Sequence, residues 1–149
     1  MYTIRRYTNE LQNDIIGFLE NVLPESGRKL DLDGRHSFLM CILDAYEKFW
    51  CLYDEECLIG TVGIKKIGKE KCELKTLYLY HRYHGHGLGY QLLSTAIEYA
   101  KRAGYKEMYL DTLSTSKRAI HLYESVGFTL TERYNDNFMS EIFMVLKLV

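Results

Sequence analysis

The sequence predicts a mixed α/β domain built on a mostly antiparallel sheet. Some segments carry apolar residues at helical spacing, and others carry short alternating or continuous apolar runs. The runs between residues 49 and 80 are separated only by short polar turns, which is typical of antiparallel hairpins. Farther along, one long helix joins two strand-like runs, and a strand–helix–strand unit favours a parallel, right-handed crossover. The expected order of elements is βααβββαβαββ.

The N-terminal part is expected to hold one strand and two helices. Residues 2–7 alternate loosely between apolar and polar and predict a strand. A first helix follows, capped by Thr8 or Asn9, and a stretch with proline and glycine ends it. Its apolar residues recur at helical spacing: Leu11, Ile15, Phe18, Leu19 and Val22. A second helix, starting at Asp31 or Asp33, is expected to present Phe38, Leu39, Ile42, Leu43 and Tyr46.

Three strands and a long helix follow. The strands lie within residues 49–80 and are separated by polar turns at 54–56 and 68–70. The helix is expected to end at Gly104, because glycine is common just past a helix C-terminus. Its apolar face consists of Leu88, Leu92, Leu93, Ala96, Ile97 and Ala100. Residues 106–112 predict the next strand.

A shorter helix and a hairpin complete the order. Ser114 or Thr115 is expected to cap the helix, which ends near Gly127. Residues 128–134 and 142–148 then predict a final antiparallel hairpin.

Length and composition indicate one domain over residues 1–149. The chain is 47% hydrophobic and 26% charged, which is ordinary for a globular protein. Its formal net charge of −1 argues against a general nucleic-acid binder. No apolar run is long enough to cross a membrane, and the polar start lacks the apolar core of a signal peptide. We therefore expect a cytoplasmic protein without a membrane partner.

The four cysteines, Cys41, Cys51, Cys57 and Cys72, favour reduced thiols used for packing. No pair of them has the C-x-x-C spacing of a redox or zinc motif. A disulfide framework is rare in a cytosolic domain of this size.

The most informative segment is the glycine-dense loop at residues 84–89, which reads HGHGLG and opens the long helix. The first N–H groups of a helix have no intrahelical partner, and they point the same way as the positive end of the helix dipole. Such a loop suits a phosphate or pyrophosphate group. The third glycine falls one place too early for a dinucleotide fingerprint, and the Gly-Lys-Ser/Thr of a Walker loop is absent.

The loop does fit the pattern [Q/R]-x-x-G-x-[G/A], and it resembles the pyrophosphate loop of the GNAT acetyltransferase superfamily, with His84 in place of Gln or Arg. Residues 73–80, ELKTLYLY, resemble the strand that precedes this loop in the family. Residues 119–128, AIHLYESVGF, resemble the family signature A-I-x-L-Y-x-x-x-G-F. Ser116 stands where the family often has Asn. The resemblance extends over about residues 73–128.

This resemblance implies a splayed, GNAT-type sheet whose cleft takes acetyl-CoA as co-substrate. It implies that the pantetheine arm pairs with the main chain of Leu77 and Leu79, and that the N–H of Leu77 polarises the thioester carbonyl. It also implies that loop amides cradle the pyrophosphate. The full set of expected cofactor-binding residues is Leu77, Leu79, His84, Gly85, His86, Gly87, Leu88, Gly89, Tyr90, Ser116 and Ala119.

The side chain of His84 has two interpretations. It either donates an N–H towards phosphate or faces solvent while only its backbone contributes. The histidines at 81, 84 and 86 also raise the question of a metal site. No cysteine or carboxylate lies within the loop, and a cation would compete with the phosphates, so no metal is expected.

Two side chains match catalytic positions of the family. Glu73 matches a strand glutamate that serves as base in some members. It lies four residues before Leu77, about 13 Å along a strand, so a relay water is required. The alternative is an exposed strand charge facing Lys75 or a neighbour. Tyr123 matches the general acid, which returns a proton to the CoA thiolate.

These features predict an N-acetyltransferase that moves an acetyl group to a primary amine by direct attack. The alternatives are a CoA-binding regulatory module that is catalytically weak, and an acyltransferase that uses a different acyl-CoA or a hydroxyl acceptor. The acceptor is expected to be a small-molecule or peptide amine. Candidates to contact it are Arg28, Arg35, His36, Tyr134, Asn135, Asp136 and Asn137. The edge strands of the last hairpin suggest a homodimer as one arrangement.

Overall fold

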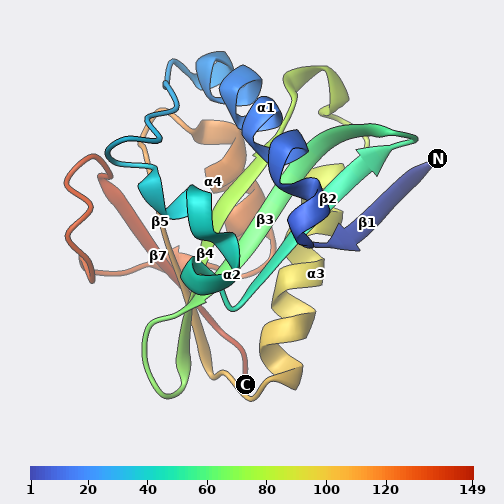
Figure 1. Ribbon diagram of the computed structural model, residues 1–149. Helices are drawn as coiled ribbons and strands as arrows, with labels where there is room; N and C mark the ends of the chain where they lie inside the picture. Colours follow the sequence, from blue (N-terminus) through green and yellow to red (C-terminus); the bar gives the residue numbers. More distant parts are fainter.

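A computed structural model describes all 149 residues as a seven-stranded sheet with helices on both faces (Figure 1). The strands are β1 (Tyr2–Arg6), β2 (Lys48–Asp54), β3 (Cys57–Lys66), β4 (Lys71–Leu79), β5 (Glu107–Thr112), β6 (Thr129–Leu130) and β7 (Ile142–Lys147). The α-helices are α1 (Gln12–Val22), α2 (Ile42–Ala45), α3 (Leu88–Arg102) and α4 (Lys117–Ser125). Short 3₁₀ turns occur at Asn9–Leu11, Leu23–Ser26, Ser37–Cys41 and His81–Tyr83. The predicted fold class and element order are confirmed.

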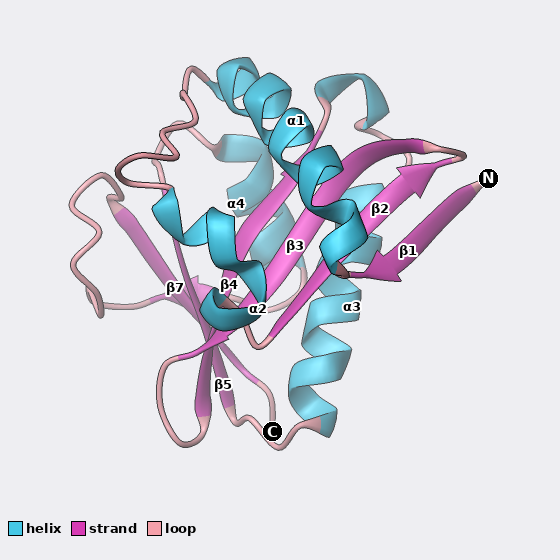
Figure 2. Ribbon diagram, in the orientation of Figure 1, coloured by secondary structure: helices cyan, strands magenta, loops and turns pink.

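The sheet has the strand order β1-β2-β3-β4-β5-β7-β6, and all neighbouring pairs are antiparallel except β4 with β5. That parallel pair is the one joined by α3, as predicted. In this pair, only Lys71–Glu73 of β4 are in register with β5, where they lie opposite Glu107–Tyr109. In Figure 2, β3 and β4 lead to the upper right of the view and β7 lies to the upper left. The sheet is therefore splayed, as the sequence resemblance implies.

The helices form two layers around the sheet. In Figure 1, α1 and α2 lie in front of the sheet, and α3 and α4 lie behind it. The predicted apolar face of α3 is confirmed, because all six of its expected residues are buried: Leu88, Leu92, Leu93, Ala96, Ile97 and Ala100. Gly104 has a φ of +90°, and the N–H of Tyr105 donates to the carbonyl of Ala100, which is the glycine-terminated helix end that the sequence predicts.

The predicted second helix is wrong in extent. Asp31 starts a turn instead, since its carbonyl accepts hydrogen bonds from the N–H groups of Gly34 and His36. Its own N–H donates to Nδ1 of His36 at 2.9 Å. Helical structure begins only at Ser37, and Leu43 is 64% exposed rather than part of the core. Local bonds around Asp31 thus compete successfully with the helix.

Two predictions near the C-terminus are also corrected. The α4 helix begins at Lys117 without a side-chain cap, because Ser114 bonds through its N–H and its hydroxyl to Glu141 Oε1 instead. The expected strand at 128–134 shortens to β6, whose residues pair with β7. Residues 131–141 leave the sheet and form a loop, which makes side-chain contacts described below.

All four cysteines are free, and Cys51 and Cys72 are buried. Burial raises the pKa of each buried thiol to about 12, so both stay protonated at neutral pH. No helix is both long and apolar enough to cross a bilayer.

Gly63 on β3 occupies a position where no side chain fits. A Cβ at this position would lie 2.5 Å from Cδ2 of Tyr46 and 3.0 Å from Cδ2 of Phe49, and both rings are in the core. We expect Gly63→Ala to lower the free energy of unfolding by about 1–3 kcal/mol through overpacking. Urea denaturation followed by circular dichroism measures this change.

Gly17, in the middle of α1, provides the matched control because a Cβ at this position would meet nothing within 4 Å. Gly17→Ala should raise the free energy of unfolding by about 0.5–1 kcal/mol, since alanine favours a helix interior. Equal effects of the two substitutions would show that the Tyr46 contact does not constrain β3.

Candidate functional site

The free edge of β4 is the first element of the site. β4 pairs with β3 on one side along most of its length, but with β5 on the other side only through Glu73. Residues 74–79 therefore have no strand partner on the β5 side. Backbone N–H and C=O groups at such an edge need another partner, either solvent or a ligand.

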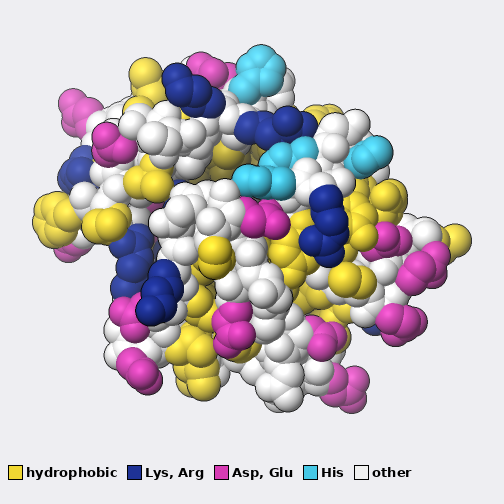
Figure 3. Space-filling view, turned by 90° about the horizontal axis from the view of Figure 1, so that it is seen from above, with side chains coloured by type: hydrophobic (Ala, Val, Ile, Leu, Met, Phe, Trp, Pro, Cys, Tyr) yellow, Lys and Arg dark blue, Asp and Glu magenta, His cyan; other side chains and the backbone are white.

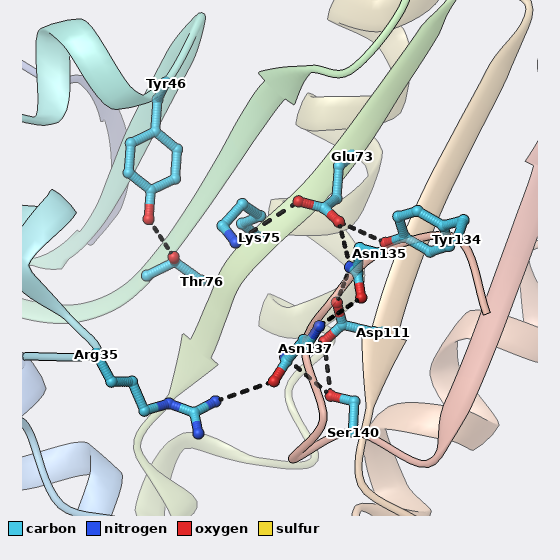
Figure 4. Close-up of polar contacts among 10 residues, drawn as sticks. All are labelled: Arg35, Tyr46, Glu73, Lys75, Thr76, Asp111, Tyr134, Asn135, Asn137 and Ser140. Atoms are coloured by element: carbon cyan, nitrogen blue, oxygen red, sulfur yellow. Dashed lines mark hydrogen bonds and ion pairs between the residues drawn. The ribbon is translucent and has the colours of Figure 1, made fainter.

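A bulge at Thr76 decides which groups face that edge. Thr76 has a φ of +58°, and the β3–β4 register shifts between Thr61 and Gly63. The hydroxyl of Thr61 donates to the carbonyl of Thr76 at 2.7 Å, which turns this carbonyl towards β3. Because N–H and C=O of one trans peptide point in opposite directions, the N–H of Leu77 faces away from β3, towards the free edge. The hydroxyls of Thr76 and Tyr46 lie 2.5 Å apart and hold the bulge from the α2 side (Figure 4).

The carbonyl of Leu79 faces the same edge. The N–H of Tyr80 donates to Ile59 on β3 at 3.2 Å, so the carbonyl that shares its peptide bond points the other way. Nε2 of His84 lies 3.2 Å from this carbonyl. The ring of His84 is thus turned back onto the end of β4, an arrangement that neither sequence interpretation included. Burial, then the charge of Arg118, lowers the pKa of His84, which favours the neutral ring.

The loop before α3 leaves a row of backbone amides open. Gly85 and Gly87 have φ values of +87° and +75°, and the first α-helical hydrogen bond runs from Gln91 N to the carbonyl of Gly87. The N–H groups of residues 88–90 have no acceptor within the helix. A Cβ at position 85 or 87 would meet nothing within 4 Å, and at Gly89 it would meet only Leu122 at 3.4 Å. No neighbouring atom covers the backbone on the Cβ side of residues 85 and 87.

The side chains of this loop lie mostly at the surface. His86 and Tyr90 are exposed. Seen from this end of the molecule, histidines cluster on the surface beside Lys and Arg side chains (Figure 3). No group of three or more His, Cys, Asp or Glu side chains is arranged to hold a metal ion.

Tyr123 lies on α4, which starts beside the free edge with Ser116 at its N-cap and Ala119 in its first turn. Its ring is buried and packs edge-on against Phe128. Burial raises its pKa well above that of a free phenol, and the neighbouring phenol of Tyr78 raises it further. Nη1 of Arg28 donates to the Tyr78 hydroxyl at 3.2 Å. The hydroxyl of Tyr123 therefore stays protonated at any physiological pH.

Glu73 is not an exposed strand charge, since only 5% of the residue is exposed. Its Oε2 accepts hydrogen bonds from the Tyr134 hydroxyl at 2.6 Å and from Asn135 Nδ2 at 3.0 Å (Figure 4). Its Oε1 lies 3.5 Å from Nζ of Lys75, the neighbour anticipated from the sequence. Burial and the Glu73 carboxylate raise the pKa of Tyr134, so this hydroxyl stays a donor.

Asp111, near the end of β5, belongs to the same polar network and was not among the residues predicted from the sequence. Its Oδ2 accepts from Asn135 at 2.6 Å, and its Oδ1 accepts from Asn137 at 2.9 Å and from Ser140 at 2.7 Å. Asn135 therefore bridges Glu73 and Asp111 across the opening between β4 and β5 (Figure 4). No local pattern singles out Asp111, because its partners lie 24 to 29 residues later in the chain.

Two other residues expected to contact the acceptor, Arg35 and His36, differ in whether they reach this network. Arg35 reaches Asn137 Oδ1 at 3.5 Å and so connects the segment before α2 with the loop at 131–141. His36 is engaged with the backbone of Asp31 and does not reach this network.

A polar groove of about 500 Å³ lies beside Glu73. Its walls are the β3–β4 hairpin and the loop at 131–141, and its floor includes Tyr109 of β5. The residues that line it are Lys65, Ile67, Lys71, Glu73, Lys75, Tyr109, Tyr134, Asn135, Asp136 and Asn137. Glu73 and Tyr123 do not contact each other: the first faces this groove, and the second lies beside Tyr78 and Arg28.

Comparisons with known proteins identify relatives of this chain. An uncharacterized N-acetyltransferase of Schizosaccharomyces pombe is 40% identical over 80 residues, which are 53% of this chain and 49% of that protein. The chain spans about half the length or less of the curated relatives it matches.

Solved structures match over the whole chain. An acetyltransferase of the GNAT family from Staphylococcus aureus Mu50 has a TM-score of 0.89 at 21% identity, with 100% of both chains covered. The PaiA N-acetyltransferase of Thermoplasma acidophilum, in complex with coenzyme A, has a TM-score of 0.77 at 21% identity, with 99% of both chains covered. These similarities show the shared fold.

The model of the acetyltransferase (GNAT) family matches residues 8–128, which include the free edge of β4, the glycine loop and Tyr123. The chain therefore belongs to the GNAT acetyltransferase family.

Proposed function

We propose that this protein transfers an acetyl group from acetyl-CoA to a primary amine by direct attack. The observation that carries the proposal is the free edge of β4, where the N–H of Leu77 faces away from β3 beside the open amides of α3. This edge can pair with an amide-containing arm while the helix N-terminus binds a diphosphate, and coenzyme A carries both groups. Acetyl-CoA supplies the activated acetyl group.

The cofactor is held by main-chain groups in this proposal. Amides from His84 to Tyr90 bind the diphosphate, and the helix dipole adds only about 0.3–1 kcal/mol, so the hydrogen bonds provide most of the binding energy. Leu77 and Leu79 pair with the pantetheine arm. The carbonyl of Leu79 already lies 3.2 Å from Nε2 of His84. An amide N–H of the arm must therefore either share this carbonyl with the His84 ring or replace the ring as its partner. Ser116 and Ala119, at the start of α4, form the opposite wall.

The acceptor amine must lose a proton before it attacks. An alkylammonium with a pKa near 10.4 costs about 4–5 kcal/mol to deprotonate at pH 7. Glu73 takes this proton through water, because the strand distance to Leu77 is about 13 Å. Tyr134 and Asn135 hold Oε2 in place, which leaves the side of Oε1 and Lys75 towards the groove.

After attack, the negative charge on the thioester oxygen is stabilised by the Leu77 N–H, and the tetrahedral intermediate collapses with CoA thiolate as the leaving group. Tyr123 then protonates the sulfur, and the extra proton of the attacking nitrogen returns to the phenolate through water, so that the amide, the thiol and the phenol all end neutral. Burial raises the pKa of the phenol, and a thiolate in the same buried environment is destabilised as well. If both anions are destabilised equally, the transfer is uphill by about 2 kcal/mol, from the gap of about 1.5 pKa units between a free phenol and a free thiol.

The proposal is tested by calorimetry with coenzyme A and by thiol release from acetyl-CoA over a panel of amines, with the product identified by mass spectrometry. We expect binding, and thiol release that depends on the amine. Absence of coenzyme A binding would refute the proposal, and binding without turnover on any amine would refute the catalytic part.

Replacing Tyr123 by Phe should lower kcat by about 100-fold or more while the dissociation constant for acetyl-CoA stays nearly unchanged, because only the proton donor is lost. Thiol-release assays measure kcat, and calorimetry measures the dissociation constant for acetyl-CoA. Tyr2→Phe, at an exposed position on β1, is the control. Unchanged turnover of Tyr123→Phe would exclude the phenol as the acid.

The role of Glu73 has a distinctive pH dependence. Glu73→Gln should lower kcat by about 100-fold at pH 7, and the deficit should shrink as the pH rises towards the amine pKa of about 10.4, where the acceptor is already neutral. Tyr134→Phe keeps the carboxylate and should have a smaller effect. A deficit that is the same at every pH would mean that Glu73 acts only structurally.

The orientation of the Leu77 N–H depends on Thr61. Thr61→Val removes the hydroxyl that holds the Thr76 carbonyl, a hydrogen bond worth about 1 kcal/mol, so kcat should fall about fivefold. Thr61→Ser keeps the hydroxyl and should remain close to wild type. If the valine variant matches wild type in kcat, the bulge is held without Thr61.

A further inference from the structure

The face of the sheet beside Glu73 is unusually rich in lysine. In the register, Lys65 on β3 lies opposite Glu73, and Glu73 lies opposite Tyr109 on β5. Strand alternation places Lys71 and Lys75 on the same face of β4 as Glu73. Nζ of Lys75 lies 5.1 Å from the ring centroid of Phe38, so this is the face on which the segment before α2 packs. All three lysines line the polar groove.

The carboxylates on this face do not neutralise these lysines. Glu107 is shared, because Lys147 forms a close ion pair with its Oε2 and Lys71 lies 4.0 Å from its Oε1. Lys71 also lies over the ring of Tyr109, 5.5 Å from its centroid, so its ammonium stays at the groove floor. The single negative charge of Glu107 therefore faces the positive charges of Lys71 and Lys147, and one of these two positive charges is not balanced.

The second carboxylate is also used. Glu73 binds Lys75 through Oε1 and two hydrogen-bond donors through Oε2. Lys65 forms no ion pair within 4.0 Å. Asp136 is the only carboxylate that lines the groove apart from Glu73. The groove thus offers the free charge of Lys65 and the shared charge of Lys71 to a ligand, although the whole chain has a net charge of −1.

The lysines lie at a defined distance from the free edge. At about 3.3 Å per residue, the row of Lys65 and Glu73 is about 13 Å from Leu77 along β4, and Lys71 is about 20 Å away. An extended peptide whose amine lies at Leu77 would place beside these lysines the residues that follow its first residue by about four to six places, which are residues five to seven. A small amine would not reach them.

From this charge and spacing we infer that the acceptor is a peptide with acidic residues at about positions five to seven, counting the acetylated residue as the first, bound by Lys65 and Lys71. This inference rests on the proposed function and specifies its substrate class. Ile67, at the end of the hairpin, and the ring of Tyr109 provide apolar contact for the peptide between the charges.

The experiment compares two peptides with a free N-terminus that differ only at residues five to seven, with glutamates in one and glutamines in the other. We expect a higher kcat/KM for the acidic peptide, by about fivefold or more, and a loss of this preference as salt is raised. Lys65→Gln and Lys71→Gln should each lower kcat/KM for the acidic peptide by about two- to fivefold, with no change for the glutamine peptide.

Lys66→Gln is the matched control, because Lys66 is the next residue on β3, pairs with Cys72 and faces the opposite side of the sheet. Lys66→Gln removes one positive charge, as Lys65→Gln does, and should leave the preference for the acidic peptide intact. An equal effect of Lys66→Gln, or equal kcat/KM values for the two peptides, would overturn the inference.

A binding measurement separates this inference from the proposed function. Fluorescence anisotropy with the labelled acidic peptide, blocked at its amine, should show salt-sensitive binding that Lys65→Gln weakens and Lys66→Gln does not. Turnover of simple amines without any acidic preference would overturn the inference and leave the proposed function standing. Displacement of the peptide by a single-stranded oligonucleotide at equal concentration would indicate that the groove binds nucleic acid. This result would also overturn the inference.

Discussion

β4 and β5 share a parallel register from Lys71 to Glu73 and then separate, and the arrangement of the cleft depends on this separation. A central strand with two complete neighbours would have no free backbone groups. Here the later half of β4 keeps one edge open in the middle of a seven-stranded sheet, while β3 fixes its other edge. The open amides of α3 begin where β4 ends, so two backbone binding surfaces adjoin without any special side chain.

The opening is closed at its base by polar side chains rather than by strand pairing. Asn135 donates to Glu73 and to Asp111, which are on β4 and β5 just where the ladder stops. No buried side-chain nitrogen or oxygen is left without a hydrogen-bond partner. Buried carboxylates are costly unless they are satisfied in this way. The loop at 131–141 therefore acts as a substitute for missing strand pairs, and the same contacts fix the position of Glu73.

The sequence predicted those parts of the molecule that local patterns determine. The buried face of α3, its glycine terminus and the glycine loop depend on spacing within one segment, and all of them are found in the structure. The helix expected from Asp31 failed because a turn formed by the same residue is an equally local alternative. The ring of His84 and the role of Asp111 could not be predicted, because their partners, Leu79 and residues 135–140, become neighbours only in the folded sheet.

β4 serves two purposes with two kinds of chemical group, and the bulge at Thr76 separates them. Before the bulge, Lys71, Glu73 and Lys75 present side chains to the groove; after it, Leu77 and Leu79 present backbone groups to the free edge. A positive φ at a β-branched residue costs of order 1–3 kcal/mol, which glycine would avoid. Threonine offsets part of that cost through its hydroxyl contact with Tyr46. The same hydroxyl contact ties the bulge to Tyr46, the residue that directly follows α2.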